Sequence, residues 1–450
     1  MKKQPLTIGL AVTVSGRWPR ELPEERLASY SAWLAKTYPT MKICAPQWVI
    51  GNSEELEEAA DLFLKEKVDI IVMVYGAFTG DDVPTRLCDL VQKPLVLWAP
   101  YEPPFAREDR LYANALVSMT MNYASVRRLG YTCYGLYGGF EDERVVEELT
   151  CILYAYQAKK IMNHAMLGLF GYRVTGFYNS TFDETLIRKV FGVRMEETDL
   201  KMVFDEMQNL EEADVQADMQ AVSTTFQGAC CLPQGHLENH SRLYLAMKNL
   251  VARQGYDYGV LKCWPEMGGL HTTPCAVLGR LADDNIHVGC EGDVDASLTT
   301  MALHAITGCP PFITDMININ EEINTMTFWH CGNAAPSLHD ESSHPVIANH
   351  PLAGQGTAFW TSLKAGAVTI ARFYNFHGKY RLFLMKGEAI EQDRYTRGTM
   401  ANVKLQNPVR NVVLDMMKEE IPHHYSLVWA DVAGEMKKLA ELLQIEVIEM

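Results

Sequence analysis

The chain has 450 residues, enough for two or three domains, and its 48% hydrophobic and 21% charged content is ordinary for a folded globular protein. Its net charge of −16 argues against a nucleic-acid surface, because phosphate binding needs clustered Lys and Arg. No apolar run is long enough for a membrane helix, and the 11 irregularly spaced cysteines indicate reduced thiols in the cytoplasm rather than a disulfide framework.

Residues 1–142 are predicted to form a first domain in which strands and helices alternate. Apolar runs predict strands buried on both faces at Ile8–Val14, Val68–Tyr75, Pro94–Ala99 and Tyr134–Phe140. Residues 53–68 have apolar side chains at helical spacing, with Ser53 as the expected N-cap of a capping box. This order predicts a doubly wound α/β sheet, whose ligands bind beyond the carboxyl ends of the strands.

The loop after the first strand is too polar for a core, and it carries Arg17, Trp18 and Arg20. A solvated loop is one interpretation, and a contact with a sugar or a neighbouring subunit is an equal alternative. No G-x-G-x-x-G motif follows the strand, so a dinucleotide is not predicted.

Residues 143–308 are predicted to form a second doubly wound α/β domain. A long helix over 141–165 is followed by helices over 183–192 and 236–253. A strand beginning near residue 258 then delivers Trp264 and Glu266 to a loop. The domain closes with a short buried helix that Gly308 ends.

Acidic side chains surround this last helix. Glu291, Asp293 and Asp295 precede it, and Asp315 is expected at the end of a strand that begins at Phe312. Acids at the ends of neighbouring strands are well placed to share one ligand. In the alternative interpretation, Asp293 or Asp295 is only the helix N-cap and Asp315 is a surface acid.

Residues 309–450 are predicted to form a β-rich C-terminal domain, because β-rich runs broken by glycines follow residue 340 without a long helix. Arg372, Lys379 and Arg381 are expected to be solvated strand residues. If they faced the site instead, an anionic sugar would become a plausible substrate. The pair His423–His424 precedes a late apolar strand.

One set of polar residues lies beside strand ends or tight turns: Glu266, Glu291, Asp293, Asp315, His330 and His424. Carboxylates with imidazoles, and no clustered thiolates, suit Mn²⁺ or Mg²⁺. Such a cation can bind two adjacent oxygens of a polyol and polarise a carbonyl, while a carboxylate moves a proton at the neighbouring carbon.

Two other classes of function remain open on these residues alone. A non-catalytic sugar-binding or sensor protein would need the Trp and Arg contacts but no pair of acids. A metal-dependent hydrolase or aldolase has the right ligands. However, the chain shows no nucleophile motif, Schiff-base lysine context or phosphate-binding loop.

At these residues the chain resembles the L-fucose isomerase and L-arabinose isomerase family over nearly its whole length. CEGDVDASL is similar to the family's glutamate motif, FITDMI to its aspartate motif and IPHHYSLVWADVAGE to its histidine segment. IGLAVTVSGRWPRE resembles the family's first strand and Arg loop, and VVEELTCILYAYQAKKIMNHAMLGLFG the start of its second domain. The joint occurrence of these motifs in order is specific, although each alone is weak.

The resemblance implies two α/β domains followed by a β-rich domain, in a homo-oligomer, commonly a hexamer, whose active sites are closed by a neighbouring subunit. It implies Mn²⁺, with Mg²⁺ or Co²⁺ as substitutes, bound by Glu291, Asp315 and His424. It also implies aldose–ketose isomerisation through a cis-enediol, with Glu291 and Asp315 as the acid/base pair. His330 is either a further metal ligand or a sugar contact. The expected substrate-binding residues are Arg17, Trp18, Trp264, Glu266, His330 and Asn333.

The chain departs from the family in two ways. It is shorter than typical L-fucose isomerases, with the shortfall in the C-terminal domain, and WHCGNAAPSLH matches neither branch. The substrate therefore stays open among a deoxyhexose, a pentose and an anionic hexose such as sulfoquinovose.

Overall fold

The computed structural model describes residues 5–102, 111–341 and 343–450. The chain divides into two compact units, Lys3–Gln157 and Ala158–Met450, which we call the N-terminal and C-terminal units. The division falls inside helix α5 (Glu143–His164). The predicted boundaries of three domains, at 142 and 308, are not tested by this division and stay a prediction.

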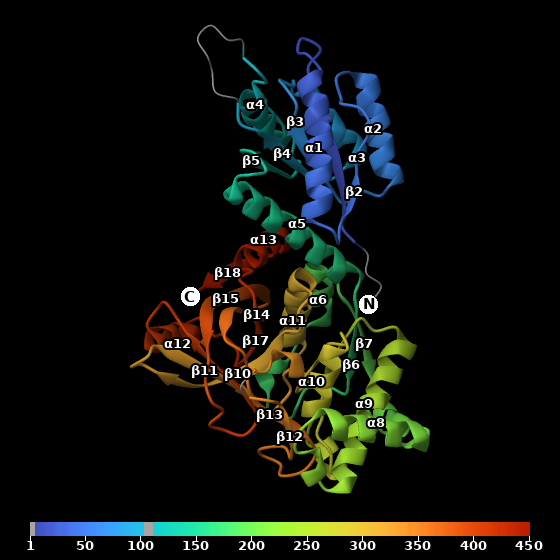
Figure 1. Cartoon of the computed structure of the whole chain (residues 1–450), viewed down its shortest axis with the longest axis vertical. Helices are drawn as coiled ribbons and strands as arrows, with labels where there is room; N and C mark the ends of the chain where they lie inside the picture. Colours follow the sequence, from blue (N-terminus) through green and yellow to red (C-terminus); the bar gives the residue numbers. More distant parts are fainter. Residues whose placement is uncertain (1–4, 103–110, 342) are drawn as a thin grey trace. The chain divides into compact units, whose positions relative to one another are not determined.

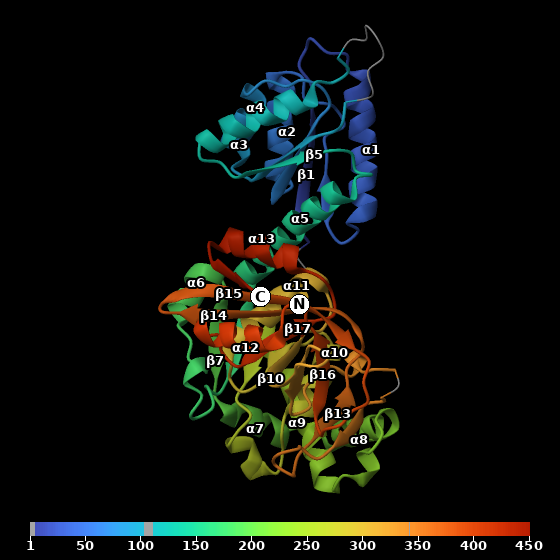
Figure 2. The same cartoon turned by 90° about the vertical axis from the view of Figure 1, so that its left-hand side faces the viewer.

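A five-stranded parallel sheet forms the centre of the N-terminal unit, with strand order β2-β1-β3-β4-β5. This is one of the two common orders of doubly wound sheets. The strands are β1 (Thr7–Thr13), β2 (Lys42–Cys44), β3 (Ile70–Tyr75), β4 (Leu95–Ala99) and β5 (Cys133–Tyr137). The helices are α1 (Glu21–Thr37), α2 (Ser53–Lys65), α3 (Asp82–Val91) and α4 (Ala115–Arg128). Figure 2 shows α1 on one side of the sheet and α2, α3 and α4 on the other.

The apolar runs explain why this sheet forms, because every residue of β1, β3 and β4 is buried, as expected for parallel strands covered on both faces. Two details differ from the sequence prediction. The edge strand β2 has only three residues and was not predicted. The N-cap of α2 is Asn52, whose side chain accepts a hydrogen bond from the backbone N–H of Glu55, and not Ser53.

The C-terminal unit begins with a four-stranded parallel sheet of order β7-β6-β8-β9. Its strands are β6 (Met166–Phe170), β7 (Arg194–Thr198), β8 (Tyr258–Leu261) and β9 (Val288–Gly289). Its helices are α6 (Glu184–Phe191), α7 (Leu200–Gln208), α8 (Glu212–Thr225), α9 (Gln234–Gln254) and α10 (Cys275–Asp283). The predicted helices over 183–192 and 236–253 are thus confirmed, and so is the long helix over 141–165 that appears as α5.

A nine-stranded mixed sheet follows, with order β12-β13-β16-β11-β10-β17-β14-β15-β18. Because β15 also pairs with β16, the strands from β16 to β15 close into a barrel. The strands are β10 (Phe312–Asn320), β11 (Thr325–His330), β12 (Val346–Ala348), β13 (Ala358–Ser362), β14 (Gly366–Phe376), β15 (Lys379–Ile390), β16 (Thr399–Lys404), β17 (His424–Val428) and β18 (Glu446–Glu449). Helices α12 (Val409–Lys418) and α13 (Ala433–Leu443) complete this part. Parallel sheets followed by a β-rich region confirm the predicted α/β class.

Helix α11 (Val294–Thr307) connects the parallel sheet to the barrel. It is buried along most of its length and ends at Gly308, which takes the left-handed conformation that glycine favours. It packs against β8 and β9 on one side and against β14 and β17 on the other, and Figure 1 shows it beside β14 and β17. The residues at its N-terminus are therefore held between the two sheets.

None of the helices in the described residues is both long enough and apolar enough to span a membrane. No disulfide joins any of the 11 cysteines, all of which lie in the described residues. The prediction of reduced thiols agrees with this arrangement.

Candidate active site

Glu291 lies two residues after β9, at the carboxyl end of the four-stranded parallel sheet. Its backbone has φ 59°, in the left-handed region that non-glycine residues rarely adopt, and Gly292 follows at φ 67°. A Cβ on Gly292 would lie 2.3 Å from the carbonyl oxygen of Tyr172, so only glycine fits against the loop after β6. The strained turn directs the Glu291 side chain, which is only 13% exposed, toward the barrel.

Asp315 and His424 face each other across the antiparallel pair β10–β17. Residues in direct register have neighbouring side chains on the same face of a sheet. Nε2 of His424 lies 3.6 Å from Oδ1 of Asp315 and 3.2 Å from Oε2 of Glu291. Asp315 lies inside β10 and not at a strand end, and it belongs to a different sheet from Glu291. The two acids therefore converge, but not from the ends of neighbouring strands, which corrects the expectation of the sequence analysis.

His330 ends β11 and is buried beside His424, with ring centres 5.8 Å apart. One ligand atom each from Glu291, His330 and His424 lie within 4.8 Å of one another, as do those of Asp315, His423 and His424. Asn333 lies nearby, since its Nδ2 donates to the carbonyl oxygen of Ile313, two residues before Asp315. The structure thus brings His330 and Asn333 close to the three predicted ligands.

Several polar atoms of this cluster are buried without a hydrogen-bond partner among the described residues: Oδ1 of Asp315, both ring nitrogens of His330, Oδ1 of Asn333 and Nε2 of His424. Burying a polar atom without a hydrogen-bond partner or a bound ion lowers the stability of the folded state. Two carboxylates and two imidazoles with unused lone pairs fit a hard or borderline divalent cation. The donor set is therefore suited to Mn²⁺ or Mg²⁺.

The charges in the cluster act on one another. Burial opposes ionisation of Glu291, but His424 and His330 hold its pKa below the usual value. Burial raises the pKa of Asp315 in spite of the same two histidines. Burial disfavours a charged ring at His424, yet the neighbouring carboxylates of Asp293 and Glu291 raise its pKa to about 10. Each group is thus perturbed by its neighbours, as is common at functional sites.

The thiols of Cys263 and Cys290 lie on another side of Glu291, with ligand atoms of all three within 4.8 Å. This corrects the expectation that thiols do not cluster here. A hydrogen bond with Cys290, together with burial, raises the pKa of the Cys263 thiol well above its ordinary value. A neutral thiol is a poor metal ligand, so the oxygen and imidazole atoms remain the better donors.

Arg372 is fully buried, which corrects the expectation of a solvated strand residue. Its NH1 donates to Oδ2 of Asp293 at 2.9 Å, and the same oxygen accepts from Nδ1 of His424 at 2.9 Å. Asp293 also caps α11 through a hydrogen bond from the backbone N–H of Ala296. Of the other two cations, Lys379 is exposed as expected, whereas Arg381 is half-buried and pairs with Glu419 and Glu446.

Aromatic rings form a wall beside His424. The rings of His423 and His424 are 4.0 Å apart, Phe177 lies 5.2 Å from His423, and Trp264 lies 5.9 Å from Phe177. Trp264 keeps 43% of its surface exposed, so it lies at the outer end of this row of rings. An exposed aromatic face next to converging polar groups is typical of a sugar-binding wall.

The loop after β6 also carries a cation, Arg173. Arg173 is the residue whose backbone packs on Gly292, and its guanidinium lies 5.3 Å from the ring centre of Tyr178. Its Nε is buried without a hydrogen-bond partner in the described part of the chain. Glu266, in contrast, forms an ion pair with Lys262, so the structure gives it a partner other than the cluster.

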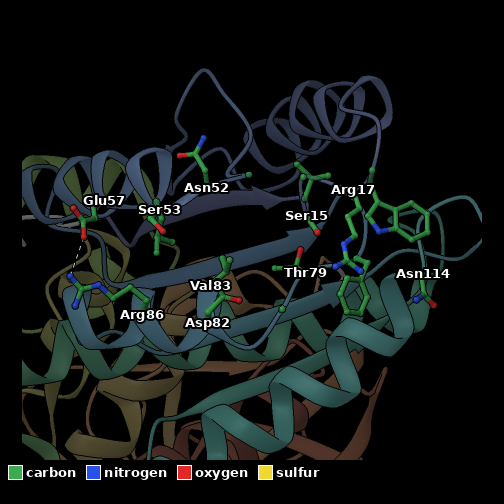
Figure 3. A pocket seen from close by; sticks show the side chains of 17 residues that line it. Ser15, Arg17, Asn52, Ser53, Glu57, Thr79, Asp82, Val83, Arg86 and Asn114 are labelled. Atoms are coloured by element: carbon green, nitrogen blue, oxygen red, sulfur yellow. Dashed lines mark hydrogen bonds and ion pairs between the residues drawn. The ribbon is translucent and has the colours of Figure 1, made fainter.

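Arg17 and Trp18 lie in the N-terminal unit, where they line a cavity of about 980 Å³. The cavity lies beyond the carboxyl ends of β1 and β3, which is where a sheet of this strand order binds ligands. Figure 3 shows Arg17 on one side of this cavity and the ion pair of Arg86 with Glu57 on the opposite side.

Sequence reasoning overlooked Arg173, Phe177 and the link between Arg372 and Asp293. Phe177 and Arg173 follow β6, in a stretch to which the sequence analysis assigned no functional residue. Arg372 stands between apolar residues of a strand, and an unbroken apolar context around one arginine was the available signal for burial with a partner.

Comparison with known proteins agrees with this geometry. Residues 328–450 match the model of the L-fucose isomerase C-terminal domain. The sulfoquinovose isomerase of Priestia aryabhattai is 25% identical over 416 residues, which are 92% of this chain and 92% of that protein. The sulfoquinovose isomerase of Alkalicoccus urumqiensis is 27% identical over 397 residues, 87% of this chain and 88% of that protein.

Among solved structures, a periplasmic solute-binding protein from Actinobacillus succinogenes with bound D-allose covers 68% of this chain and 92% of its own. It has 11% sequence identity and a TM-score of 0.17, which is too low to support an argument. The relatives matched in sequence, in contrast, span most of the chain. Together with the matched domain, they support the conclusion that this chain is a sugar aldose–ketose isomerase whose C-terminal part is similar to the L-fucose isomerase C-terminal domain.

Proposed function

We propose that the protein is a Mn²⁺-dependent isomerase of a free monosaccharide, with the cation held by Glu291, Asp315 and His424. The observation that carries the proposal is the convergence of these side chains from two sheets, with buried atoms left without partners. We propose His330 as a fourth ligand or as a contact with the sugar, because it lies beside His424 and Glu291. When bound, the cation would act as a Lewis acid on the carbonyl and hydroxyl oxygens at C1 and C2.

The two carboxylates would then move protons. One takes the proton from C2 of the open-chain aldose while a proton reaches O1, which gives a cis-enediol. A proton is then delivered to C1 and the O2 proton leaves, which gives the ketose. Glu291 and Asp315 are the pair proposed for these transfers, because their carboxylates lie 3.2 Å and 3.6 Å from Nε2 of His424.

We infer that the sugar is anionic, with sulfoquinovose as the first candidate. The relatives bear that substrate in their names, and a sulfonate needs a cation or several donors to bind it. Arg173 supplies a cation in the loop that also places Phe177 against His423. Trp264 would form the apolar wall of the pocket, with Asn333 as a hydrogen-bonding partner of the sugar and Glu266 as a more distant one.

Arg17 and Trp18 are proposed as further sugar contacts supplied by a neighbouring copy in a cytoplasmic homo-oligomer, a hexamer being favoured. Their place at the carboxyl ends of β1 and β3 supports a ligand-binding role. Sedimentation velocity would measure the assembly. A monomeric enzyme with full activity would contradict the contribution of these residues.

The deciding experiment is an isomerisation panel on chelator-treated protein, with and without Mn²⁺, Mg²⁺ or Co²⁺. The sugars are sulfoquinovose, L-fucose, D- and L-arabinose and neutral hexoses, and NMR detects the ketose. We expect Mn²⁺-dependent conversion of sulfoquinovose. Conversion without any metal would overturn the ligand assignment, and conversion of a neutral sugar alone would overturn the anionic substrate.

The competing interpretation as a non-catalytic sugar-binding or sensor protein is disfavoured by the similarity to sulfoquinovose isomerases over most of the chain. A sensor needs no pair of buried acids around a histidine, and these groups would only lower its stability. Tight sugar binding that survives chelation, without any conversion, would support the sensor.

A further inference from the structure

A buried carboxylate lies directly behind the proposed metal ligand His424. Asp293 is 1% exposed, and its Oδ2 is shared by Nδ1 of His424 and NH1 of Arg372, each at 2.9 Å. Its other oxygen, Oδ1, accepts the backbone N–H of Ala296 and so caps α11. Helix capping alone would use only one of these oxygens, and Asn or Ser would serve as well. The second oxygen and its buried counter-ion therefore need another explanation.

The geometry explains what Oδ2 does to the imidazole. An ionised carboxylate only accepts hydrogen bonds, so Nδ1 of His424 must carry the hydrogen that faces it. In the neutral ring the lone pair is then on Nε2, which lies 3.2 Å from Glu291 and 3.6 Å from Asp315. Arg372 keeps a positive charge against Asp293 and holds it between β14 and the start of α11. The ring orientation is thus set by residues that do not touch the cation.

We propose that Asp293 and Arg372 are positioning residues that fix the tautomer and orientation of His424 for the divalent cation. This inference rests on the proposed function, because it takes His424 as a metal ligand. Neither residue is a catalytic residue, since each acts through the imidazole. Carboxylates that hold a ligating histidine in this way typically change metal affinity by about 10–100-fold when they are altered.

The test is Asp293→Asn in the full-length protein. Asn can still cap α11 through its oxygen, but its amide N–H₂ would face Nδ1 and donate to it. The hydrogen of a neutral ring would then move to Nε2, where no lone pair is left for a cation. We expect Mn²⁺ affinity, measured by EPR of the free ion during titration of metal-free protein, to fall about 10–100-fold. Activity should return in part at high Mn²⁺, which a purely structural defect would not allow.

Asp295→Asn is the matched control. Asp295 is also in the first turn of α11 and buried, but its carboxylate accepts from the Tyr380 hydroxyl at 2.7 Å and not from His424. Its variant should bind Mn²⁺ within about twofold of the wild type. An equal loss of affinity in both variants would mean that any buried carboxyl group in this region matters, and the inference would be overturned.

Asp293→Asn alone leaves the buried charge of Arg372 without its partner, so the variant could fail to fold. The double variant Asp293→Asn/Arg372→Met removes both charges while the amide still faces His424. We expect a folded protein by circular dichroism with the same low Mn²⁺ affinity. Wild-type affinity in the folded double variant would refute the inference. Absence of Mn²⁺ binding by the wild type would instead refute the metal assignment of the proposed function.

Discussion

Both units place charged side chains near the carboxyl ends of a parallel sheet, but they treat those charges in opposite ways. In the N-terminal unit, Arg86 and Glu57 form an ion pair whose side chains are 50% and 59% exposed. In the C-terminal unit, Glu291 is 13% and His424 1% exposed, and Nε2 of His424 has no hydrogen-bond partner in the described residues. Water hydrates the exposed ion pair of the N-terminal unit. The buried polar groups of the C-terminal unit need a bound ligand to satisfy them.

The difference in exposure decides how strongly the charges of each unit interact. A charge in water is screened and can be removed at little cost, while the same charge in a buried cluster interacts strongly with every neighbour. The predictions below test this contrast, beginning with the largest expected effect.

Glu291→Gln should lower kcat by about 10²–10⁴-fold, because the variant cannot move a proton and loses one anionic ligand. NMR of the ketose measures the rate, and circular dichroism checks that the fold is retained. Near-normal turnover in a folded variant would remove Glu291 from the mechanism.

Mn²⁺ should stabilise the C-terminal unit selectively. At a free concentration about a hundredfold above Kd, binding to the native state alone adds about 2.7 kcal/mol to the free energy of unfolding. Hydrogen exchange should slow in β10 and β17 and stay unchanged in β1 and β3. Equal protection in both units would show that the ion is not confined to the buried cluster.

Arg173→Met should lower kcat/KM for sulfoquinovose by about 10–100-fold, since hydrogen bonds to a charged group contribute about 1.5–3 kcal/mol. A neutral aldose that the enzyme converts should be little affected. Lys262→Met is the control, because Lys262 is already paired with Glu266. If Lys262→Met lowers kcat/KM for sulfoquinovose more than Arg173→Met does, the anion is bound by Lys262, which follows β8, and Arg173 is not its partner.

Asp295 should make stability depend on pH. Burial, against the opposing charge of Arg372, raises the pKa of Asp295 to about 7, above its unfolded value of about 3.9. Between these values the native state holds a proton that the unfolded state releases, so stability falls as pH rises through this window. The melting temperature of Asp295→Asn relative to the wild type should therefore increase from pH 4.5 to 7.5. A constant difference would show that Asp295 is ionised in the native state throughout.

Arg86→Met should have the smallest effect, below about 1 kcal/mol in the free energy of unfolding, because its ion pair with Glu57 is exposed. Thermal unfolding measures it, and Glu57→Gln gives the matched partner variant. A large loss in either would mean that this pair is shielded by a partner in solution.

Local sequence patterns were enough to predict most helices and strands, but not the closure of the C-terminal strands into a barrel. Apolar runs located β1, β3 and β4, because strands covered on both faces have little choice of residue. The strand β2 has only three residues, which is too short for a recognisable alternation or run of apolar residues. The pairing of β15 with β16, which closes the barrel, depends on contacts that no single segment encodes.

For the candidate site, sequence pattern supplied the ligand types and missed what surrounds them. Glu291, Asp315 and His424 were singled out, and the structure brings them together. Arg372 was misplaced because a charged residue in a strand is usually solvated, and only Asp293, far away in sequence, makes its burial tolerable. The sequence around Arg372 alone cannot show that a distant carboxylate will compensate its buried charge.

The position of α11 between the parallel sheet and the barrel has a consequence for assembly. Glu291 arrives from one layer, and Asp315 and His424 from the other, so neither layer folded alone can present the complete set. Affinity for the proposed cation would therefore report that the parallel sheet and the barrel have packed correctly against each other. A chain in which these two layers packed incorrectly would lack the complete site and would therefore be inactive. Activity would thus depend on correct folding of both layers.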